Sequence, residues 1–367
     1  MKTLSIIGST GSIGRSSLKV FEKNKKFFIL DSLAANKNLK KILLQTKKYN
    51  PANFILLDKN IKTKNRKFIS FENFIKNRIK KIDYVISGIS GYDALQINLK
   101  LLKISKNLLI ANKETIICGG KVFMDLAKKH KCKIIPIDSE HHCIDFFVNN
   151  FKNKKNIKKI FLTASGGPFL KKRINYFTKA SRATKHPTWK MGKHISVNSS
   201  TLANKVLELF EAKILFNLNK NMLDIKIEET SNIHAIIQLK NNFCIQIAHR
   251  PSMQIPISNS LNVSNIQNFY NKNFTFNILN PDYKKFPIVK LGKSILNKYN
   301  HYLMIIFTVY NERLVNLYLK NKINYGDISK YLVKIFSQKF IIKKSKEKIK
   351  NSNDIFNAIS FAKNLKI

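Results

Sequence analysis

Two carboxylates, Asp138 and Glu140, stand two residues apart at the end of an apolar run, residues 134–137. In an extended backbone such residues point to the same side, so both carboxylates can reach one ion. Hard oxygen ligands select Mg²⁺ or Mn²⁺ over zinc. Acidic residues on a loop are usually surface groups, but this chain has only 21 of them against 67 basic residues. The clustered pair is therefore a candidate metal site.

A second stretch with chemical potential is SSTLANKVLE, residues 199–208, which predicts a helix from about Thr201. Asn204, Lys205 and Glu208 share one face of that helix. The hydroxyl groups at its start suit an anion. A surface ion pair between Lys205 and Glu208, contributing well under about 1 kcal/mol, is the alternative interpretation. Together the two stretches indicate a place for a metal ion and a phosphate, which favours an enzyme.

A glycine-rich turn, GSTGSIG at residues 8–14, follows the first apolar run and precedes a helical pattern. Glycines permit a tight turn and let a pyrophosphate approach the backbone at a helix N-terminus. The spacing is GxxGxxG instead of GxGxxG, so an ordinary strand-to-helix turn is the alternative. Lys37 lies in the loop after the second apolar run, whereas Asp31 lies inside that run. A cation at this place accommodates a 2′-phosphate, which favours NADP over NAD.

Alternating apolar and amphipathic segments predict the elements that must position these residues. Buried parallel strands are expected at residues 4–7, 27–33, 54–57, 84–87, 108–111 and 133–137. Amphipathic stretches at 39–49 and 92–102 predict crossover helices, and the alternation as a whole predicts a doubly wound α/β sheet. Further strands, typical of a mixed or antiparallel sheet, are expected at 159–163, 224–228, 234–239 and 243–248. Helices are expected at 201–216, 303–319, 325–337 and 353–365.

These patterns predict an α/β protein of several domains, as its length of 367 residues requires. We expect a Rossmann-like nucleotide-binding domain at residues 1–138 and an α+β central domain at residues 139–262. An Asn-rich linker is expected at residues 263–285, and a helical bundle domain at residues 286–367.

The net charge of +46 is extreme and raises the alternative of a nucleic-acid-binding protein. The lysines are spread along the chain, however, and no nucleic-acid module is recognisable, so we expect neither nucleic acid nor a membrane as partner. The 4 cysteines show no disulfide-like spacing, and no apolar run approaches the roughly 18 residues that cross a bilayer. The pattern favours a reduced, cytoplasmic protein.

Six motifs then occur in a characteristic order. They are GSTGSIG (8–14), ANKE (111–114), IDSEH (137–141), TASGGPF (163–169), HPTWKMG (186–192) and ISVNSSTLANKVLE (195–208). Together they resemble the 1-deoxy-D-xylulose 5-phosphate reductoisomerase family. The resemblance covers almost the whole chain, including FPIVKLG at 286–292. Several long motifs in order are far more specific than any one of them.

The resemblance implies NADPH-dependent rearrangement and reduction of 1-deoxy-D-xylulose 5-phosphate to 2-C-methyl-D-erythritol 4-phosphate, in the non-mevalonate isoprenoid pathway, by a homodimer whose central domain is catalytic. It implies a Mg²⁺, Mn²⁺ or Co²⁺ ion bound by Asp138, Glu140 and Glu208. The implied catalytic and substrate contacts are Lys113, Ser139, Glu140, Ser165, His186, Ser199, Asn204, Lys205 and Glu208. The implied NADPH contacts are Thr10, Gly11, Ser12, Ile13, Asn36, Lys37, Asn38, Asn112, Glu114 and Gly192.

Three further side chains match the family, namely Trp189, expected with His186 on a lid over the substrate, and the histidines His141 and His234. The chain also departs from the family's usual residues. The departures are Asn36 for Gly, Asn198 for Asp, Val206 for a small residue, Glu228-Glu229 for His-Pro, and Ser252 for Asp. None removes a predicted metal ligand or a residue of the predicted phosphate-binding set, so we expect reduced efficiency or stability and not a dead enzyme. A different NADP-dependent dehydrogenase, whose turnover would survive chelation, is the alternative.

Overall fold

The computed structural model describes residues 1–61, 63–151, 154–189, 191–263 and 277–367. Its chain forms two compact units. The first contains Met1–Thr115, Phe123–His142 and the segment that begins at Ser252, and the second contains Ile116–Val122, Cys143–Pro251 and the C-terminal part ending at Ile367. Of the linker expected at 263–285, residues 264–276 lie outside the described residues.

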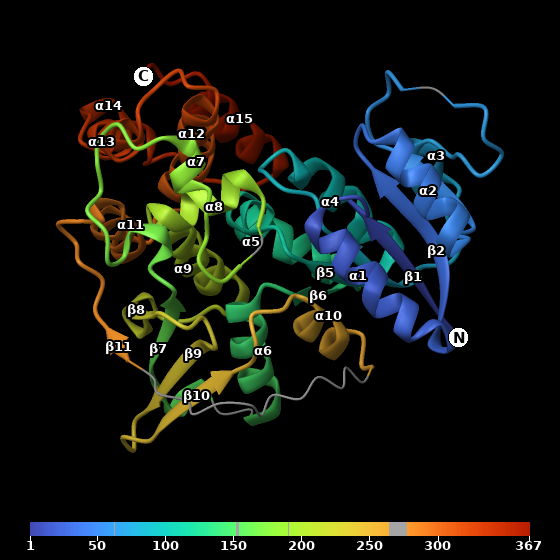
Figure 1. The fold of residues 1–367 in the computed structure, drawn as a ribbon, viewed down its shortest axis with the longest axis horizontal. Coiled ribbons are helices and arrows are strands. Elements are labelled where there is room, and N and C mark those ends of the chain that lie inside the picture. Colours follow the sequence, from blue (N-terminus) through green and yellow to red (C-terminus); the bar gives the residue numbers. More distant parts are fainter. Residues whose placement is uncertain (62, 152–153, 190, 264–276) are drawn as a thin grey trace. The chain divides into compact units, whose positions relative to one another are not determined.

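A parallel six-stranded sheet forms the centre of the first unit (Figure 1). Its order is β3-β2-β1-β4-β5-β6, the order of doubly wound dinucleotide-binding sheets. The strands are β1 (Lys2–Ile7), β2 (Phe28–Ala35), β3 (Asn53–Leu56), β4 (Ile82–Ser87), β5 (Ser105–Ile110) and β6 (Lys133–Pro136). Each corresponds to an apolar run that predicted a strand, so the expected doubly wound sheet is confirmed.

Helices cover this sheet, because its strands are apolar on both faces. Helices with residues in the first unit include α1 (Ser12–Lys23), α2 (Leu39–Tyr49), α3 (Phe71–Lys76), α4 (Ala94–Ile104), α5 (Lys113–Lys129) and α10 (Gln254–Ser260), and η1 (Lys25–Phe27) is a 3-10 turn. α2 spans the same residues as the crossover helix that was expected there. Leu4, Ile6 and Leu33 have no exposed surface. Ile257 of α10 joins the same core, which places α10 against α1.

Helix α5 contains a kink at Gly120, where φ is 50° and ψ is −143°. The imidazole of His301 fills the space beside this glycine, since an ideal Cβ there would lie 2.2 Å from the ring. His301 Nε2 also lies 2.8 Å from the carbonyl oxygen of Ile117. Only glycine fits this position, both for its positive φ and for the ring.

A mixed five-stranded sheet lies in the second unit, with the order β10-β9-β7-β8-β11 (Figure 1). Its strands are β7 (Ile157–Ala164), β8 (Leu223–Glu228), β9 (Ile233–Leu239), β10 (Cys244–Ala248) and β11 (Ile278–Leu279). β7 and β8 are parallel, and the other neighbouring pairs are antiparallel. The mixed sheet expected from the sequence is confirmed, and β11 is an addition to it.

Helices make up the rest of the second unit. They are α6 (Ser139–Phe151, which begins in the first unit), α7 (Ala180–Ala183), α8 (Lys193–Ser200), α9 (Ala203–Phe216), α11 (Pro287–Lys298), α12 (His301–Leu319), α13 (Tyr325–Phe336), α14 (Lys339–Lys344) and α15 (Ser352–Lys363). Short 3-10 turns are η2 (Lys154–Asn156), η3 (Gly167–Phe169) and η4 (Lys220–Met222). The sequence did not predict α8. Leu202, with a left-handed φ of 59°, separates α8 from α9.

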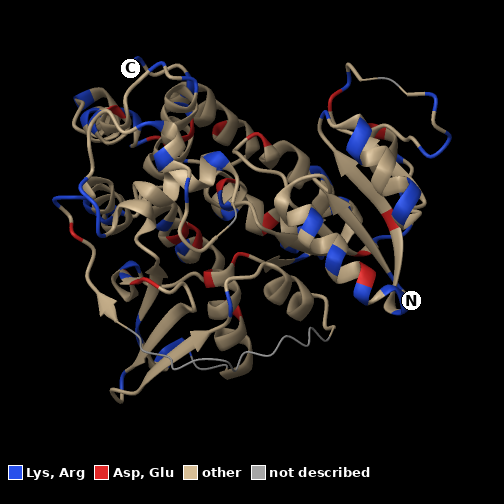
Figure 2. Cartoon of the chain, in the orientation of Figure 1, with Lys and Arg blue, Asp and Glu red and all other residues tan. Residues whose placement is uncertain are grey.

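Lysine and arginine residues occur on helices and loops of both units (Figure 2). They are not gathered on one element, which agrees with a dispersed surface charge. Within the described ranges, no helix has both the length and the apolar character needed to cross a membrane.

Candidate active site

The glycine-rich turn joins β1 to α1 and is shaped by close backbone contacts. Gly8, at φ 88°, and Ser9 both donate their N–H groups to the carbonyl of Ala34 at 2.8 Å. An ideal Cβ on Gly14 would lie 2.3 Å from the Gly8 carbonyl oxygen. In the described structure no side chain caps α1 at Gly11. The first N–H groups of α1 therefore remain available to a phosphate, as at other dinucleotide-binding turns.

The loop after β2 presents the three residues expected to contact the 2′-phosphate end of the cofactor. Asn36, Lys37 and Asn38 are all exposed. The Asn38 side chain accepts the N–H of Lys41 at 3.0 Å and so caps α2. Lys37 Nζ lies 3.6 Å from a carboxylate oxygen of Asp58. Lys37 thus projects from the loop with its amine free to reach solvent.

Asp31, the acidic residue inside β2, is already engaged. Both of its carboxylate oxygens accept from the Arg78 guanidinium, at 2.7 and 2.9 Å, and Ser5 Oγ donates at 3.1 Å. A bidentate pair of this kind holds the carboxylate in place. Asp31 is therefore a structural residue, and the described end of β2 offers a cation instead of an acid.

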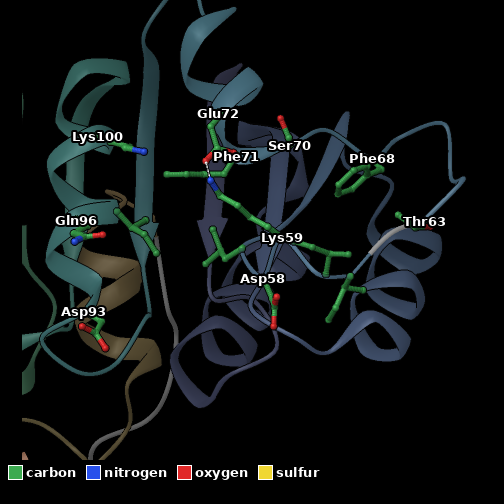
Figure 3. Close-up of a pocket in the computed structure, with 14 residues that line it drawn as sticks. Asp58, Lys59, Thr63, Phe68, Ser70, Phe71, Glu72, Asp93, Gln96 and Lys100 are labelled. Carbon is green, nitrogen blue, oxygen red and sulfur yellow. Dashed lines mark ion pairs between the residues drawn. The ribbon is translucent and has the colours of Figure 1, made fainter.

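A cavity of about 710 Å³ opens between the end of β3, α3 and α4 (Figure 3). Its floor is apolar and includes Leu56, Phe71 and Ile97. Its rim is charged and includes Asp58 and the ion pair between Lys59 and Glu72, which is 2.8 Å long. One lining residue, Asp58, is the ion-pair partner of Lys37.

The first turn of α5 carries Asn112, Lys113 and Glu114. Asn112 is buried and caps the helix, since its Oδ1 accepts the N–H of Thr115 at 2.5 Å, while its Nδ2 donates to Gly91 at 3.1 Å. Glu114 is half-buried. Lys113 Nζ lies 3.1 Å from Asp138 Oδ2, and the two side chains are only 11% and 15% exposed. The structure thus brings the predicted Lys113 and Asp138 together.

The extended backbone that the sequence predicted from Asp138 to Glu140 is wrong. β6 ends at Pro136 and α6 begins at Ser139, so the two acids do not share an extended backbone. The Asp138 carbonyl accepts the N–H of His142 at 2.8 Å, which closes the first helical turn. Ser139 is buried, and Glu140, in that turn, is half-buried. His141, buried, holds its Nδ1 3.2 Å from Asp138 Oδ2.

In the second unit, α9 carries a buried polar face. Lys205 Nζ lies 2.5 Å from Glu208 Oε2, with the two side chains 5% and 1% exposed. Asn204 Nδ2 donates to Glu208 Oε1 at 2.6 Å. The alternative of a surface ion pair is therefore wrong, because both charges lie in the interior. Burying two charges is costly unless they are paired and hydrogen-bonded, which makes this face a candidate functional site.

His186 and Ser165 also come together in the second unit. His186 Nδ1 accepts the backbone N–H groups of Trp189 at 3.0 Å and Thr188 at 3.3 Å. The ring proton is therefore on Nε2, which donates to Ser165 Oγ at 3.0 Å. Burial, and less strongly the charge of Lys205, lower the pKa of His186 to about 4. The ring is thus a neutral hydrogen-bond donor near pH 7.

The loop after β7 packs directly on α8. Gly167 has φ 67°, and an ideal Cβ on it would lie 2.8 Å from the carbonyl oxygen of Ser199. This close approach places Ser199 beside the loop that carries Ser165. Gly192 is the exposed N-cap of α8.

Comparison with known proteins decides the family. A profile of 1-deoxy-D-xylulose 5-phosphate reductoisomerase matches residues 4–120, one of its C-terminal domain matches 134–216, and one of the DXP reductoisomerase C-terminal domain matches 249–365. A 1-deoxy-D-xylulose 5-phosphate reductoisomerase of Pelagibacter ubique is 40% identical, over 97% of this chain and 96% of its own. The chain belongs to the 1-deoxy-D-xylulose 5-phosphate reductoisomerase family. A reductoisomerase of Clostridium novyi is 33% identical, over 98% of this chain and 96% of its own.

Solved reductoisomerases have the same fold. A crystal structure of DOX-P reductoisomerase in complex with NADPH, fosmidomycin and magnesium superposes with a TM-score of 0.88 at 26% identity, covering 99% of this chain and 97% of that chain. The reductoisomerase from Zymomonas mobilis, in complex with NADPH, superposes with a TM-score of 0.84 at 25% identity, covering 99% and 97%. The reductoisomerase fold therefore extends over nearly the entire chain.

Several departures from the reductoisomerase pattern have partners in the structure. Asn198 Oδ1 accepts from Asn311 Nδ2 at 2.9 Å in the interior. Val206 packs on Gly292, where an ideal Cβ would lie 2.2 Å from the valine. Ser252 Oγ accepts an N–H at 3.4 Å at the start of α10. These residues are thus accommodated by their neighbours.

Sequence reasoning missed Thr188 and Ser231, whose hydroxyl oxygens lie 3.0 Å apart. No motif could have indicated this contact, because it joins two loops. His234 lies in β9, with its ring 6.3 Å from that of Trp189 and stacked on His249 at 3.9 Å. His234 therefore supports the tryptophan.

Proposed function

We propose that this protein is an NADPH- and metal-dependent 1-deoxy-D-xylulose 5-phosphate reductoisomerase, which forms 2-C-methyl-D-erythritol 4-phosphate for isoprenoid synthesis. The observation that carries the proposal is the buried face of α9, where Asn204, Lys205 and Glu208 are linked by short polar contacts. A charged, interior set of this kind fits a phosphorylated substrate and a hard cation. Family membership supplies the specific substrate.

The residues fit both groups that the reaction needs. Three carboxylates, on Asp138, Glu140 and Glu208, are half-buried or buried and offer hard oxygen donors suited to Mg²⁺, Mn²⁺ or Co²⁺. The turn at Gly8 and Gly14 is a cradle that a Cβ would fill. We assign NADPH to this turn, with Lys37 toward the 2′-phosphate and the adenosine end toward the cavity at β3. The proposed cofactor contacts are Thr10, Gly11, Ser12, Ile13, Asn36, Lys37, Asn38, Asn112, Glu114 and Gly192.

A divalent cation polarises the substrate's carbonyl and hydroxyl oxygens for rearrangement, and NADPH supplies the hydride that reduces the aldehyde. The chain's own residues orient the substrate. Ser165, Ser199, Asn204 and Lys205 bind the phosphate and the neighbouring hydroxyl groups. Neutral His186 donates from Nε2 without adding positive charge beside Lys205. Lys113 pairs with Asp138 and, with Ser139, contacts the substrate at the metal end.

Trp189 covers the substrate and excludes water, which strengthens the polar contacts beneath it. The indole is half-buried. We further assign the enzyme to the cytoplasm as a homodimer, in line with its reduced cysteines and its family.

The test measures the oxidation of NADPH, monitored by its absorbance. The assay contains purified protein, Mg²⁺ or Mn²⁺, and 1-deoxy-D-xylulose 5-phosphate. We expect turnover that EDTA abolishes and that fosmidomycin inhibits. A folded protein that binds NADPH but does not turn over would contradict the proposal. Turnover that survives EDTA would instead favour a simple NADP-dependent dehydrogenase.

A further inference from the structure

The turn between β8 and β9 is built on a buried carboxylate. Glu228 ends β8 and is 1% exposed. Its Oε1 accepts the N–H of Thr230 at 2.8 Å, and its Oε2 accepts those of Asn232 at 3.1 Å and Ile233 at 3.3 Å. A carboxylate that accepts three backbone N–H groups fixes the path of the backbone around it.

The resemblance noted in the sequence implies that Glu228 and Glu229 stand where the family usually has His-Pro. A proline presets φ and offers no N–H. Glu229 does not preset φ, so the path of the turn depends on the acceptor oxygens that Glu228 provides. Glu229 itself forms an ion pair with Lys171 Nζ at 2.5 Å.

The turn presents Ser231 to the lid. Ser231 has a left-handed φ of 58° and is 7% exposed. Its Oγ lies 3.0 Å from Thr188 Oγ1, and that hydroxyl lies 3.3 Å from His186 Nδ1. With Lys171 at one end and Thr188 at the other, the turn contacts the segment 171–189 near both of its ends.

The order of the hydrogen bonds follows from His186. Its Nδ1 carries no proton, so the Thr188 hydroxyl, 3.3 Å away, can only donate to it. Thr188 Oγ1 then accepts from the Ser231 hydroxyl. The series ends at His186 Nε2–H, which donates to Ser165. Each bond in such a series fixes the direction of the next.

We propose that Glu228 is a positioning residue for the reaction, acting through Ser231 and Thr188 on His186. Its carboxylate fixes the turn, and the turn holds the lid residue Thr188. Thr188 in turn contacts His186 Nδ1 and so holds the ring with its Nε2–H directed at Ser165. This inference rests on the proposed function, in which His186 and Ser165 contact the substrate.

Trp189 provides a direct test, because it is the sole tryptophan of the sequence and adjoins Thr188. Glu228→Gln keeps the side-chain size but replaces one acceptor oxygen by an NH₂ group. We expect this variant, and Ser231→Ala, to shift Trp189 emission to longer wavelength and to increase its quenching by acrylamide. The matched control is Asp224→Asn on the same strand, which removes an ion pair with Lys293 and should leave Trp189 emission unchanged.

Activity measurements supply the second readout. Glu228→Gln should raise KM for the sugar phosphate by about 5-fold, the effect of one hydrogen bond, with Kd for NADPH unchanged. In the double variant with Ser231→Ala, the effect should be no larger than that of the stronger single variant, because both act through one contact.

The proposal is overturned if Glu228→Gln lowers Tm but leaves Trp189 emission and KM unchanged, or if the two substitutions act independently. Should Glu228→Gln fail to fold, Ser231→Ala decides, since unchanged Trp189 emission in that variant also overturns the proposal. The fluorescence test needs no turnover. It therefore separates failure of this inference from failure of the proposed function.

Discussion

The glycine-rich turn of the first unit and the α9 face of the second unit are built on different principles. The turn binds through its backbone, and its requirement at Gly8 and Gly14 is the absence of a Cβ. The binding that we propose for the α9 face uses charged side chains, and its requirement is that Lys205 and Glu208 stay paired in the interior. The turn should therefore be sensitive to side-chain size, and α9 to charge.

Glu208→Gln tests the charge-dependent region and should have the largest effect. We expect turnover to fall by about 10³-fold or more, because the change removes a proposed metal ligand and the charge that balances Lys205. Affinity for NADPH should be nearly unchanged, as measured by titration of NADPH fluorescence. Glu347→Gln, at an exposed position in the loop after α14, is the control. Loss of NADPH binding in Glu208→Gln would show that the two regions are not independent.

Gly14→Ala tests the size-dependent region. The added methyl group would meet backbone atoms of Gly8 and Ser9, so the turn must shift. We expect Kd for NADPH to rise by about 10- to 100-fold, the usual cost of overpacking expressed as affinity. Lys19→Ala, on the exposed side of α1, serves as control. An unchanged Kd would mean that the pyrophosphate does not approach this turn.

Lys37→Ala tests a side chain of the proposed NADPH site, which the first unit otherwise forms mainly with backbone groups. Removing this exposed cation should raise KM for NADPH by about 10-fold and leave KM for NADH unchanged. The ratio of kcat/KM values for the two cofactors measures this. Equal losses with both cofactors would assign Lys37 to the loop structure instead of the 2′-phosphate.

The smallest expected effect concerns pH and the second region. Burial lowers the pKa of His186 from 6.5 to about 4, so the unfolded state binds more protons between these values. The contribution of His186 to the free energy of unfolding should therefore be complete above about pH 6.5 and should decrease as the pH falls toward 4. Urea unfolding at several pH values measures the slope. His186→Asn should reduce that slope, and an identical slope would show that the histidine is not buried.

The sequence predicted most elements because their signals are local. Apolar runs indicated the strands of both sheets, and α2 agrees with its pattern at both ends. The backbone from Asp138 to Glu140 was wrongly predicted as extended because the chain turns into a helix at Ser139, which an apolar run before it cannot reveal. The two carboxylates nevertheless lie within 4.8 Å of each other, as one shared ion requires. The domain boundaries at residues 138, 262 and 285 stay predictions.

Burial was harder to predict than secondary structure. Lys205 and Glu208 have the spacing of a surface pair, and only the packing around α9 shows that they are interior. The Ser231–Thr188 contact joins residues 43 positions apart in two loops, for which no periodic pattern exists. The capping roles of Asn38 and Asn112, by contrast, follow from a residue type that favours N-caps and could have been predicted.

The contact between His301 and the kink at Gly120 has a consequence for biosynthesis. The ring that fills the kink is 184 residues away from the carbonyl of Ile117 that it contacts. A growing chain must therefore emerge well past its midpoint before α5 can take its final path. Contacts of such large sequence separation form late and slow the folding reaction. We expect truncated nascent chains that end before residue 301 to be susceptible to proteolysis around Gly120.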